Sequence, residues 1–304
     1  MGNLAWLDTL APPTLRLLFF GGKGGVGKTT CAAAVALALA DRRPAARILL
    51  LSTDPAHSVA DVLEVALGDD ERPVPGAPPG LYARELDAQR AFAAWRGRYD
   101  EAFEEAGVGD LLDLTPPGLD ELIALSSLLD AVAEGDGAGA FDLVVVDTAP
   151  TGHALRLLEM PELALGWDHY LLSVLLKYRQ AVGLGDLAAE LVALSRRLKR
   201  LQALLRDPGR ARFVAVARAG ELPGRETVRL LRALGKLAID VPAVIVNAVS
   251  AAGCARCGGS PAELAALRGR LGRCAIIEAP ARFPPPRGVL PLAGWIRAWS
   301  RASE

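Results

Sequence analysis

The amino-acid sequence predicts an α/β fold in which a doubly wound, mainly parallel sheet carries a phosphate-binding loop. Two observations lead to this prediction. The first is the segment GGKGGVGKTT at residues 21–30, which lies between an apolar run and an alanine-rich run. The second is a series of further short apolar runs, several of which end in polar residues, where open α/β sheets place their ligands.

The glycine-rich segment follows the apolar run 15–20, a predicted buried strand, and precedes the run 31–40, a predicted helix. Its glycines let successive backbone N–H groups point at phosphate oxygens, and the helix N-terminus adds about half a positive charge. Lys28 supplies an ammonium for the β- and γ-phosphates, and Thr29 supplies a hydroxyl for Mg²⁺. The loop residues predicted to cradle the nucleotide are Gly22, Gly24, Gly25, Val26 and Gly27.

A second lysine in this loop, Lys23, is not required by an ordinary phosphate-binding loop. The chain has only five lysines among its 34 basic residues, so arginine is its usual cation. Two lysines in one loop therefore indicate that a compact ammonium is needed at both positions. We expect Lys23 to reach the same phosphates as Lys28.

The composition narrows the functional classes. A net charge of −1 gives no electrostatic basis for nucleic acid as a partner. The first residues lack the features of a signal peptide, and no uncharged apolar run reaches about 18 residues, so we expect no transmembrane segment. Four cysteines do not resemble a disulfide framework. These features predict a cytoplasmic protein.

Polar residues follow the apolar run 47–52, the next predicted strand, in the segment STDPAHS at residues 52–58. Asp54 is the candidate to hold a water opposite the γ-phosphate, and His57 and Ser58 would line the same loop. The alternative is a turn in which Asp54 caps the following helix.

A strong apolar run at 141–146 leads into DTAPTGH, residues 147–153. An aspartate that closes such a strand beside a phosphate-binding loop is typical of a magnesium-binding carboxylate, so Asp147 is predicted to hold Mg²⁺. The residues after it are expected to form a mobile segment with Gly152 as its hinge. His57 and His153, two of the three histidines, fall in these two loops, which favours a functional role over a structural one, though not as metal ligands.

The sequence predicts a single domain, residues 1–304, with additional helices inserted into it. A strand is predicted at 81–86, at an edge of the sheet, and helical insertions at about 87–135 and 161–206 are expected to form a helical subdomain. The second insertion contains a dense apolar cluster. Its members pack between the two insertions or form a surface for a hydrophobic client; they include Trp167, Leu171, Leu172 and Leu175.

Two further strands are predicted at 211–217 and 241–246, with a helix between them. Asn247 follows the second strand, and its amide can both donate to and accept from an adenine edge. Near the end of the chain, residues 290–299 place four large apolar side chains on one helical face. This helix is expected to dock on the domain, and the alternative is a helix at a membrane surface.

Cys254 and Cys257 form the motif CARC in a short loop. One C-x-x-C pair supplies only two of the four ligands that structural zinc requires. The pair is therefore redox-active, or two copies meet at a symmetric interface.

The loop KGGVGKT with its extra lysine resembles the deviant Walker A motif of the MinD/ParA/ArsA group of dimerising ATPases. Within that group, the ArsA/GET branch is similar in six further segments that occur in the same order over nearly the whole chain. These are STDPAHS, LYARELD, PPGLDE, DTAPTGHALRLLEMP, the Val-Asn pair at 246–247 and CARC. The branch comprises arsenite-pump ATPases and the ATPases that target tail-anchored membrane proteins.

The resemblance implies a role for each matching position. Lys28, Thr29 and Thr30 fall on the phosphate and magnesium positions, and Lys23 on a lysine that reaches across a dimer. Asp54 and Asp147 fall on the aspartates of two nucleotide-sensing loops, here named switch I (residues 54–58) and switch II (residues 147–153). The adenine positions are Asn247, Pro280, Ala281 and Arg282, and the pair Cys254 and Cys257 would bind one zinc together with its symmetry mate.

The sequence also departs from the family pattern. Ala219-Gly220 replaces a Pro-Glu pair, and Pro284 to Pro286 replace acidic positions near the adenine loop. Only two methionines occur, so a methionine-lined client groove is not expected. Neither insertion contains cysteine, which disfavours thiolate binding of arsenite.

Together these features predict a homodimeric ATPase that uses ATP and Mg²⁺. The leading expectation for its role is handling or targeting of a hydrophobic, tail-anchored client protein. The second is the ATPase subunit of an arsenite or antimonite pump. The third is a positioning ATPase of the MinD/ParA type, which CARC and DTAPTGH disfavour.

Overall fold

The computed structural model describes residues 4–54, 58–87, 90–91, 93, 119–132, 141–177, 184–250, 261–271 and 274–302. Its strands are β1 (Leu17–Gly21), β2 (Ile48–Ser52), β3 (Arg72–Pro73), β4 (Leu81–Glu85), β5 (Leu143–Asp147), β6 (Ala211–Arg218), β7 (Ala243–Val249), β8 (Ala275–Pro280) and β9 (Ser300–Arg301). Its helices are α1 (Trp6–Leu10), α2 (Lys28–Arg42), α3 (Ser58–Leu63), α5 (Leu119–Ala131), α6 (Thr151–Lys177), α7 (Leu184–Leu205), α8 (Glu221–Lys236), α9 (Pro261–Leu271) and α10 (Val289–Ile296).

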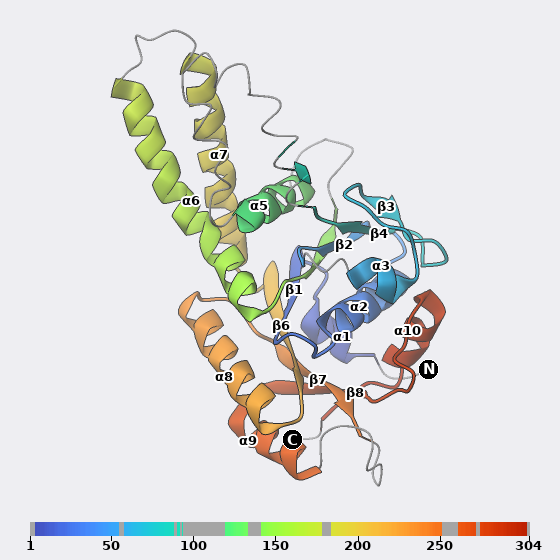
Figure 1. The fold of residues 1–304 in the computed structure, drawn as a ribbon. Coiled ribbons are helices and arrows are strands. Elements are labelled where there is room, and N and C mark those ends of the chain that lie inside the picture. Colours follow the sequence, from blue (N-terminus) through green and yellow to red (C-terminus); the bar gives the residue numbers. More distant parts are fainter. Residues whose placement is uncertain are drawn as a thin grey trace.

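The strands form one sheet in the order β3-β4-β2-β5-β1-β6-β7-β8-β9 (Figure 1). All neighbours pair in parallel except β3 and β9, the two-residue strands at the edges. The chain leaves β1 toward β2 and β4, returns through β5 and then continues to β6 on the other side. The predicted doubly wound, mainly parallel sheet is confirmed, and its strand order reverses next to β1.

Helices cover both faces of the sheet because side chains of the inner strands alternate between the faces. Leu18 and Phe20 pack into a core with α1, α2, α3 and α10. Leu17 and Phe19 pack into a second core with α5 to α9. Both sides of β1 are thus buried, as expected for a central parallel strand.

The C-terminal helix docks on the domain as predicted. Leu292, Trp295, Ile296 and Trp299 are each at most 4% exposed. α10 contacts α2. Trp299 stacks on Trp6 with ring centroids 5.6 Å apart. The alternative of a helix at a membrane surface is therefore wrong.

Helices α6 and α7 form an antiparallel pair that extends away from the sheet (Figure 1). α6 begins at Thr151, ten residues before the expected boundary, and Pro161 lies inside it. The side chains of Trp167, Leu171, Leu172 and Leu175 lie outside the described residues, although their backbone is helical. In the described part of the chain, no helix is long and apolar enough to cross a membrane.

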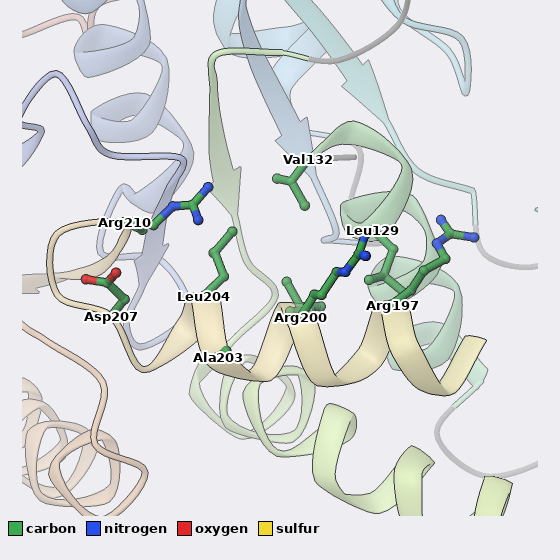
Figure 2. A pocket seen from close by; sticks show the side chains of 9 residues that line it. Leu129, Val132, Arg197, Arg200, Ala203, Leu204, Asp207 and Arg210 are labelled. Carbon is green, nitrogen blue, oxygen red and sulfur yellow. The ribbon is translucent and has the colours of Figure 1, made fainter. Parts of the chain in front are cut away.

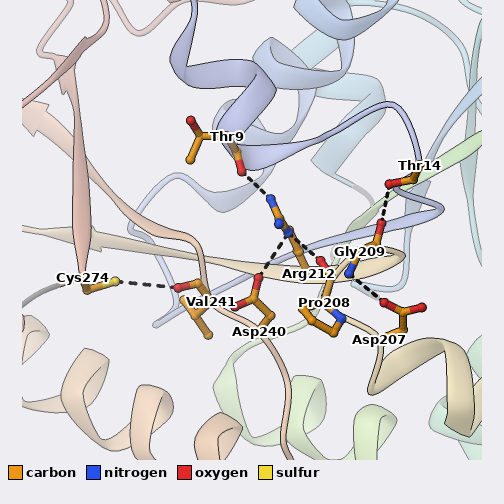
Figure 3. A network of polar contacts seen from close by, with 9 residues as sticks. All are labelled: Thr9, Thr14, Asp207, Pro208, Gly209, Arg212, Asp240, Val241 and Cys274. Atoms are coloured by element: carbon orange, nitrogen blue, oxygen red, sulfur yellow. Dashed lines mark hydrogen bonds and ion pairs between the residues drawn. The ribbon is translucent and has the colours of Figure 1, made fainter.

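The edge position predicted for the strand at 81–86 is wrong. β4 is not an edge strand, because β3 pairs with it in antiparallel orientation. Cys274 precedes β8 and is half-buried, with its Sγ 4.0 Å from the carbonyl oxygen of Val241 (Figure 3). In the same region Arg212, near the start of β6, donates to the carbonyl oxygens of Thr9 and Pro208 (Figure 3). This network joins α1 to the sheet at the amino end of β6, away from the site described next.

Candidate nucleotide site

The glycine-rich loop joins β1 to α2, and its backbone leaves no room for a Cβ at Gly22 or Gly27. A Cβ on Gly22 would lie 2.2 Å from the carbonyl oxygen of Val216. Gly27 has a φ of 89°, and a Cβ there would lie 2.3 Å from Nδ2 of Asn247. The loop is therefore held tightly against β6 and β7.

The hydroxyl of Thr29 connects the loop to both switch loops. Thr29 Oγ1 donates to Asp147 Oδ2 over 2.7 Å and lies 2.9 Å from Ser58 Oγ. Since Thr29 has one hydroxyl proton and gives it to Asp147, Ser58 is the donor in the second bond. Three oxygen-bearing side chains, from α2, α3 and β5, thus meet at one point.

Asp147 is fully buried at the end of β5, and its Oδ1 has no hydrogen-bond partner among the described residues. Burial raises the pKa of Asp147 to about 7, against the hydrogen bond from Thr29 and the charge of Lys28. The nearby charges of Asp54 and Glu85 raise that pKa further. A buried carboxylate oxygen without a partner, beside two hydroxyls, fits a hard cation such as Mg²⁺.

Asp54 and Lys28 lie at the same end of the sheet. Lys28 is the first residue of α2 and is buried. Asp54 follows β2, and its backbone N–H donates to Ser52 Oγ over 3.3 Å. The N–H groups of Val59 and Ala60 in α3 donate to Glu85. His57 lies outside the described residues.

The non-helical part of switch II is shorter than predicted. α6 begins at Thr151, so Gly152 and His153 lie in its first turn. Nδ1 of His153 is 3.0 Å from Oε1 of Glu121, a buried residue of α5. Switch II thereby contacts the first helical insertion directly.

Lys23 forms an ion pair within its own chain. Its Nζ lies 3.2 Å from Oε1 of Glu226 on α8, and both side chains are about one third exposed (39% and 33%). Such a partly solvated pair contributes about 0–1 kcal/mol, so it can be exchanged for another partner at little cost.

The predicted adenine positions lie together beside the loop, around a cavity of about 220 Å³. Asn247 lies within β7 rather than after it; its Nδ2 donates to the carbonyl oxygen of Val26 over 2.8 Å, and its Oδ1 accepts from Ala248. The cavity is lined by Gly25, Val26, Gly27, Thr30, Arg218, Asn247, Ala248, Pro280, Ala281, Arg282, Pro285, Pro286 and Trp295. Two of the prolines that replace the family's acidic positions thus belong to this cavity.

A larger cavity, of about 720 Å³, lies elsewhere (Figure 2). Side chains from α5, α7 and the turn after α7 line it, and the phosphate-binding loop does not contribute. The lining residues are Leu129, Val132, Arg197, Arg200, Leu201, Ala203, Leu204, Asp207 and Arg210. It is therefore a separate feature of the helical insertions.

Cys254 and Cys257 lie outside the described residues. Among the residues that are described, no group of three or more histidine, cysteine, aspartate or glutamate side chains has the arrangement of a metal centre. The zinc prediction remains a prediction.

The sequence did not predict three glutamates that contact the phosphate-binding loop or the switches: Glu85, Glu121 and Glu226. The available signal for Glu85 was a carboxylate at the end of a predicted strand, LYARE. Glu121 and Glu226 lie on helices, and nothing in their spacing identifies a partner far away in the chain.

A glycine-rich loop between β1 and α2, a buried aspartate on the adjacent strand and a cavity beside the loop define the class of P-loop nucleotide hydrolases. The family model described as "Anion-transporting ATPase" matches residues 15–259. The chain belongs to this anion-transporting ATPase (ArsA) family, and it is an ATPase. ATP is thus its nucleotide.

Individual relatives are similar over most of the chain. The ATPase ASNA1 homolog of Entamoeba histolytica is 32% identical over 78% of this chain and 77% of its own length. The ATPase GET3 of Candida glabrata is 34% identical over 77% of this chain and 72% of its own length. The ATPase GET3B of Arabidopsis thaliana is 33% identical over 81% of this chain and 67% of its own length.

Proposed function

We propose that this ATPase is a homodimeric switch that couples binding and hydrolysis of Mg-ATP to the capture and targeting of a hydrophobic, tail-anchored membrane protein. The proposed type of client is supported by the similarity to proteins named GET3, which extends over about three quarters of the chain or more. The switch segments and the extended α6–α7 pair support the same proposal.

The chemistry is assigned to residues at the carboxyl ends of β1, β2 and β5. Lys28 and the loop N–H groups bind the phosphates, and Thr29 and Asp147 hold Mg²⁺, which neutralises phosphate charge when bound. Asp54 orients the attacking water. Lys23 leaves Glu226 and stabilises charge on the transferring group from across the dimer.

The base is assigned to the cavity beside the loop. Asn247 donates one amide N–H to Val26 and retains a second N–H for an adenine acceptor. Pro280, Ala281 and Arg282 supply the facing wall. Asn247 therefore braces the phosphate-binding loop and reads the base with the same side chain.

The dimer is proposed to be closed by one zinc ion, held by Cys254 and Cys257 of both chains. The reasoning is that one chain supplies only two of four ligands.

The client surface is assigned to the outer half of α6, including Trp167, Leu171, Leu172 and Leu175. Two of the exposed large apolar side chains in the described residues support this location: Leu163 on α6 is 52% exposed, and Val192 on α7 is 38% exposed. Each leucine-sized side chain that a client buries contributes about 1.5–3 kcal/mol, so several together can hold an apolar segment in water.

The client assignment is tested by replacing Leu172 and Leu175 with serine. We expect the variant to lose capture of a tail-anchored substrate in a pull-down, while basal ATP hydrolysis stays within about twofold of wild type, as for surface changes. Leu290→Ser is the matched control, because Leu290 is 80% exposed on α10, outside the insertions. Unchanged capture by the double variant, or loss of folding, would contradict the assignment.

The description of the matched family favours a second candidate, the ATPase of an arsenite or antimonite pump. This candidate requires that the metalloid stimulates hydrolysis. Neither insertion contains cysteine, so we expect no stimulation by arsenite in a steady-state assay. A clear stimulation of ATP hydrolysis by arsenite would favour the pump function over the targeting function.

A further inference from the structure

A buried carboxylate beside switch I has no role in the site as assigned so far. Glu85 ends β4, and its residue is only 5% exposed. It lies opposite Ser52 in the parallel pairing of β4 with β2. Glu85 belongs neither to the phosphate-binding loop nor to a switch.

The carboxylate is bonded to the start of α3. Glu85 Oε1 accepts hydrogen bonds from the backbone N–H of Val59 over 2.7 Å and of Ala60 over 2.9 Å. α3 has only six residues, and a helix this short is not stable by itself. A carboxylate at its first N–H groups both satisfies them and interacts favourably with the helix dipole. Glu85 thereby holds the amino-terminal part of α3 at the end of β4.

The first residue of α3 is Ser58, which belongs to switch I. Its Oγ lies 2.9 Å from Thr29 Oγ1. At the other end of switch I, Asp54 donates its N–H to Ser52 Oγ, and the N–H of Leu86 donates to the Ser52 carbonyl oxygen. The end of β4 therefore braces switch I on both sides. Glu85 holds Val59 and Ala60, the two residues after Ser58, and Leu86 holds Ser52.

We propose that Glu85 is a positioning residue for ATP hydrolysis: it anchors the α3 end of switch I, so that Ser58 and Asp54 occupy the places required for Mg²⁺ and the attacking water. Glu85 itself does not touch the nucleotide. This inference rests on the proposed role of switch I in hydrolysis. If it is correct, changes at Glu85 should alter kcat and the Mg²⁺ concentration needed for activity, while nucleotide binding is preserved.

The test compares Glu85→Ala with Glu85→Gln. The alanine variant has no acceptor for the α3 N–H groups, whereas the amide oxygen of glutamine accepts them without the charge. We expect Glu85→Ala to lower kcat at least about 10-fold, because a displacement of about 1 Å in a catalytic group costs up to about 100-fold. The Mg²⁺ concentration for half-maximal activity should rise several-fold, and KM for ATP should change less than about threefold. Glu85→Gln should recover a large part of kcat.

Asp69→Asn is the matched control, since Asp69 accepts two hydrogen bonds from Arg84, the neighbour of Glu85 on β4, and does not contact switch I. It should leave kcat and magnesium dependence unchanged. Binding of a fluorescent ADP analogue and the melting temperature establish that each variant is folded. If Glu85→Ala does not fold, Glu85→Asp takes its place, because its shorter side chain cannot hold the α3 N–H groups where glutamate does; kcat should then be at least several-fold below that of Glu85→Gln.

A wild-type kcat and magnesium dependence in the folded Glu85 variants would overturn the inference while leaving the proposed function intact. Absence of ATP hydrolysis by the wild-type protein would instead refute the proposed function. The two failures are therefore distinguishable in one set of assays.

Discussion

At the scale of single residues, burial disfavours the charged form of Asp147. It is fully buried, one of its oxygens has no partner among the described residues, and burial raises its pKa to about 7. Without a cation, the charged form of this side chain is therefore unfavourable in the folded protein. The same unfavourable arrangement prepares the site for Mg²⁺.

This arrangement predicts a pH dependence for the metal-free protein. The pKa of Asp147 is higher in the folded than in the unfolded state, so between about pH 4 and pH 7 the folded state binds more protons, and its stability falls as the pH rises. The slope is at most about 1.4 kcal/mol per pH unit. Asp147→Asn removes the titration. With a chelator present, the urea concentration at the midpoint of unfolding should be higher for Asp147→Asn than for the wild type, and this difference should be larger at pH 8 than at pH 5.

Parallel pH profiles of the wild type and Asp147→Asn would show that the carboxylate is not destabilised by burial. A control for general pH effects is Asp69→Asn, which removes a carboxylate paired with Arg84.

Sequence reasoning found the residues whose roles follow from local spacing. Lys28 and Thr29 are identified by the glycine-rich loop, and Asp147 by the apolar run before it. In the structure Thr29 contacts Asp147 and Ser58, and the catalytic roles of these residues remain predictions. The partners Glu85 and Glu226 were not predicted, because each contact joins segments that only the fold brings together.

At the scale of elements, the apolar runs predicted the inner strands with small errors at their ends, because buried parallel strands require continuous apolar sequence. The second insertion was expected to begin at about 161, whereas α6 begins at Thr151. Pro161 lies within α6 instead, preceded by residues such as Leu157, Leu158 and Met160 that face the core. Their burial favours the helix over the expected loop. β3 was missed because two residues carry no pattern.

The early start of α6 has a functional consequence. It makes the end of switch II helical, and His153 in this first turn contacts Glu121 of α5. The helix that begins four residues after Asp147 thus contacts the first insertion through His153. Glu121 is buried, and its hydrogen bond with His153 helps to satisfy its carboxylate.

At the scale of the whole molecule, the proposed dimer predicts a stoichiometry. Protein purified without added zinc should contain one zinc per two chains by metal analysis, with a dimer mass in solution. Replacing Cys254 and Cys257 with serine should remove the zinc and weaken the dimer, because each chain then loses both of its ligands.

Cys274→Ser is the matched control for that experiment, since Cys274 is half-buried beside β8 and should not affect the metal. A stable dimer that contains no zinc would assign the CARC pair to redox chemistry instead.

In the proposed mechanism, Asp54 is the group that holds the attacking water. The direct measurement is ATP binding and phosphate release on the same preparations of wild type, Asp54→Asn and Lys28→Ala. We predict that Lys28→Ala does not bind ATP, and that Asp54→Asn binds it normally but releases phosphate at less than about a tenth of the wild-type rate, since a positioned catalytic group is worth about 100-fold or more. Phosphate release by Asp54→Asn above that level would contradict the proposed mechanism.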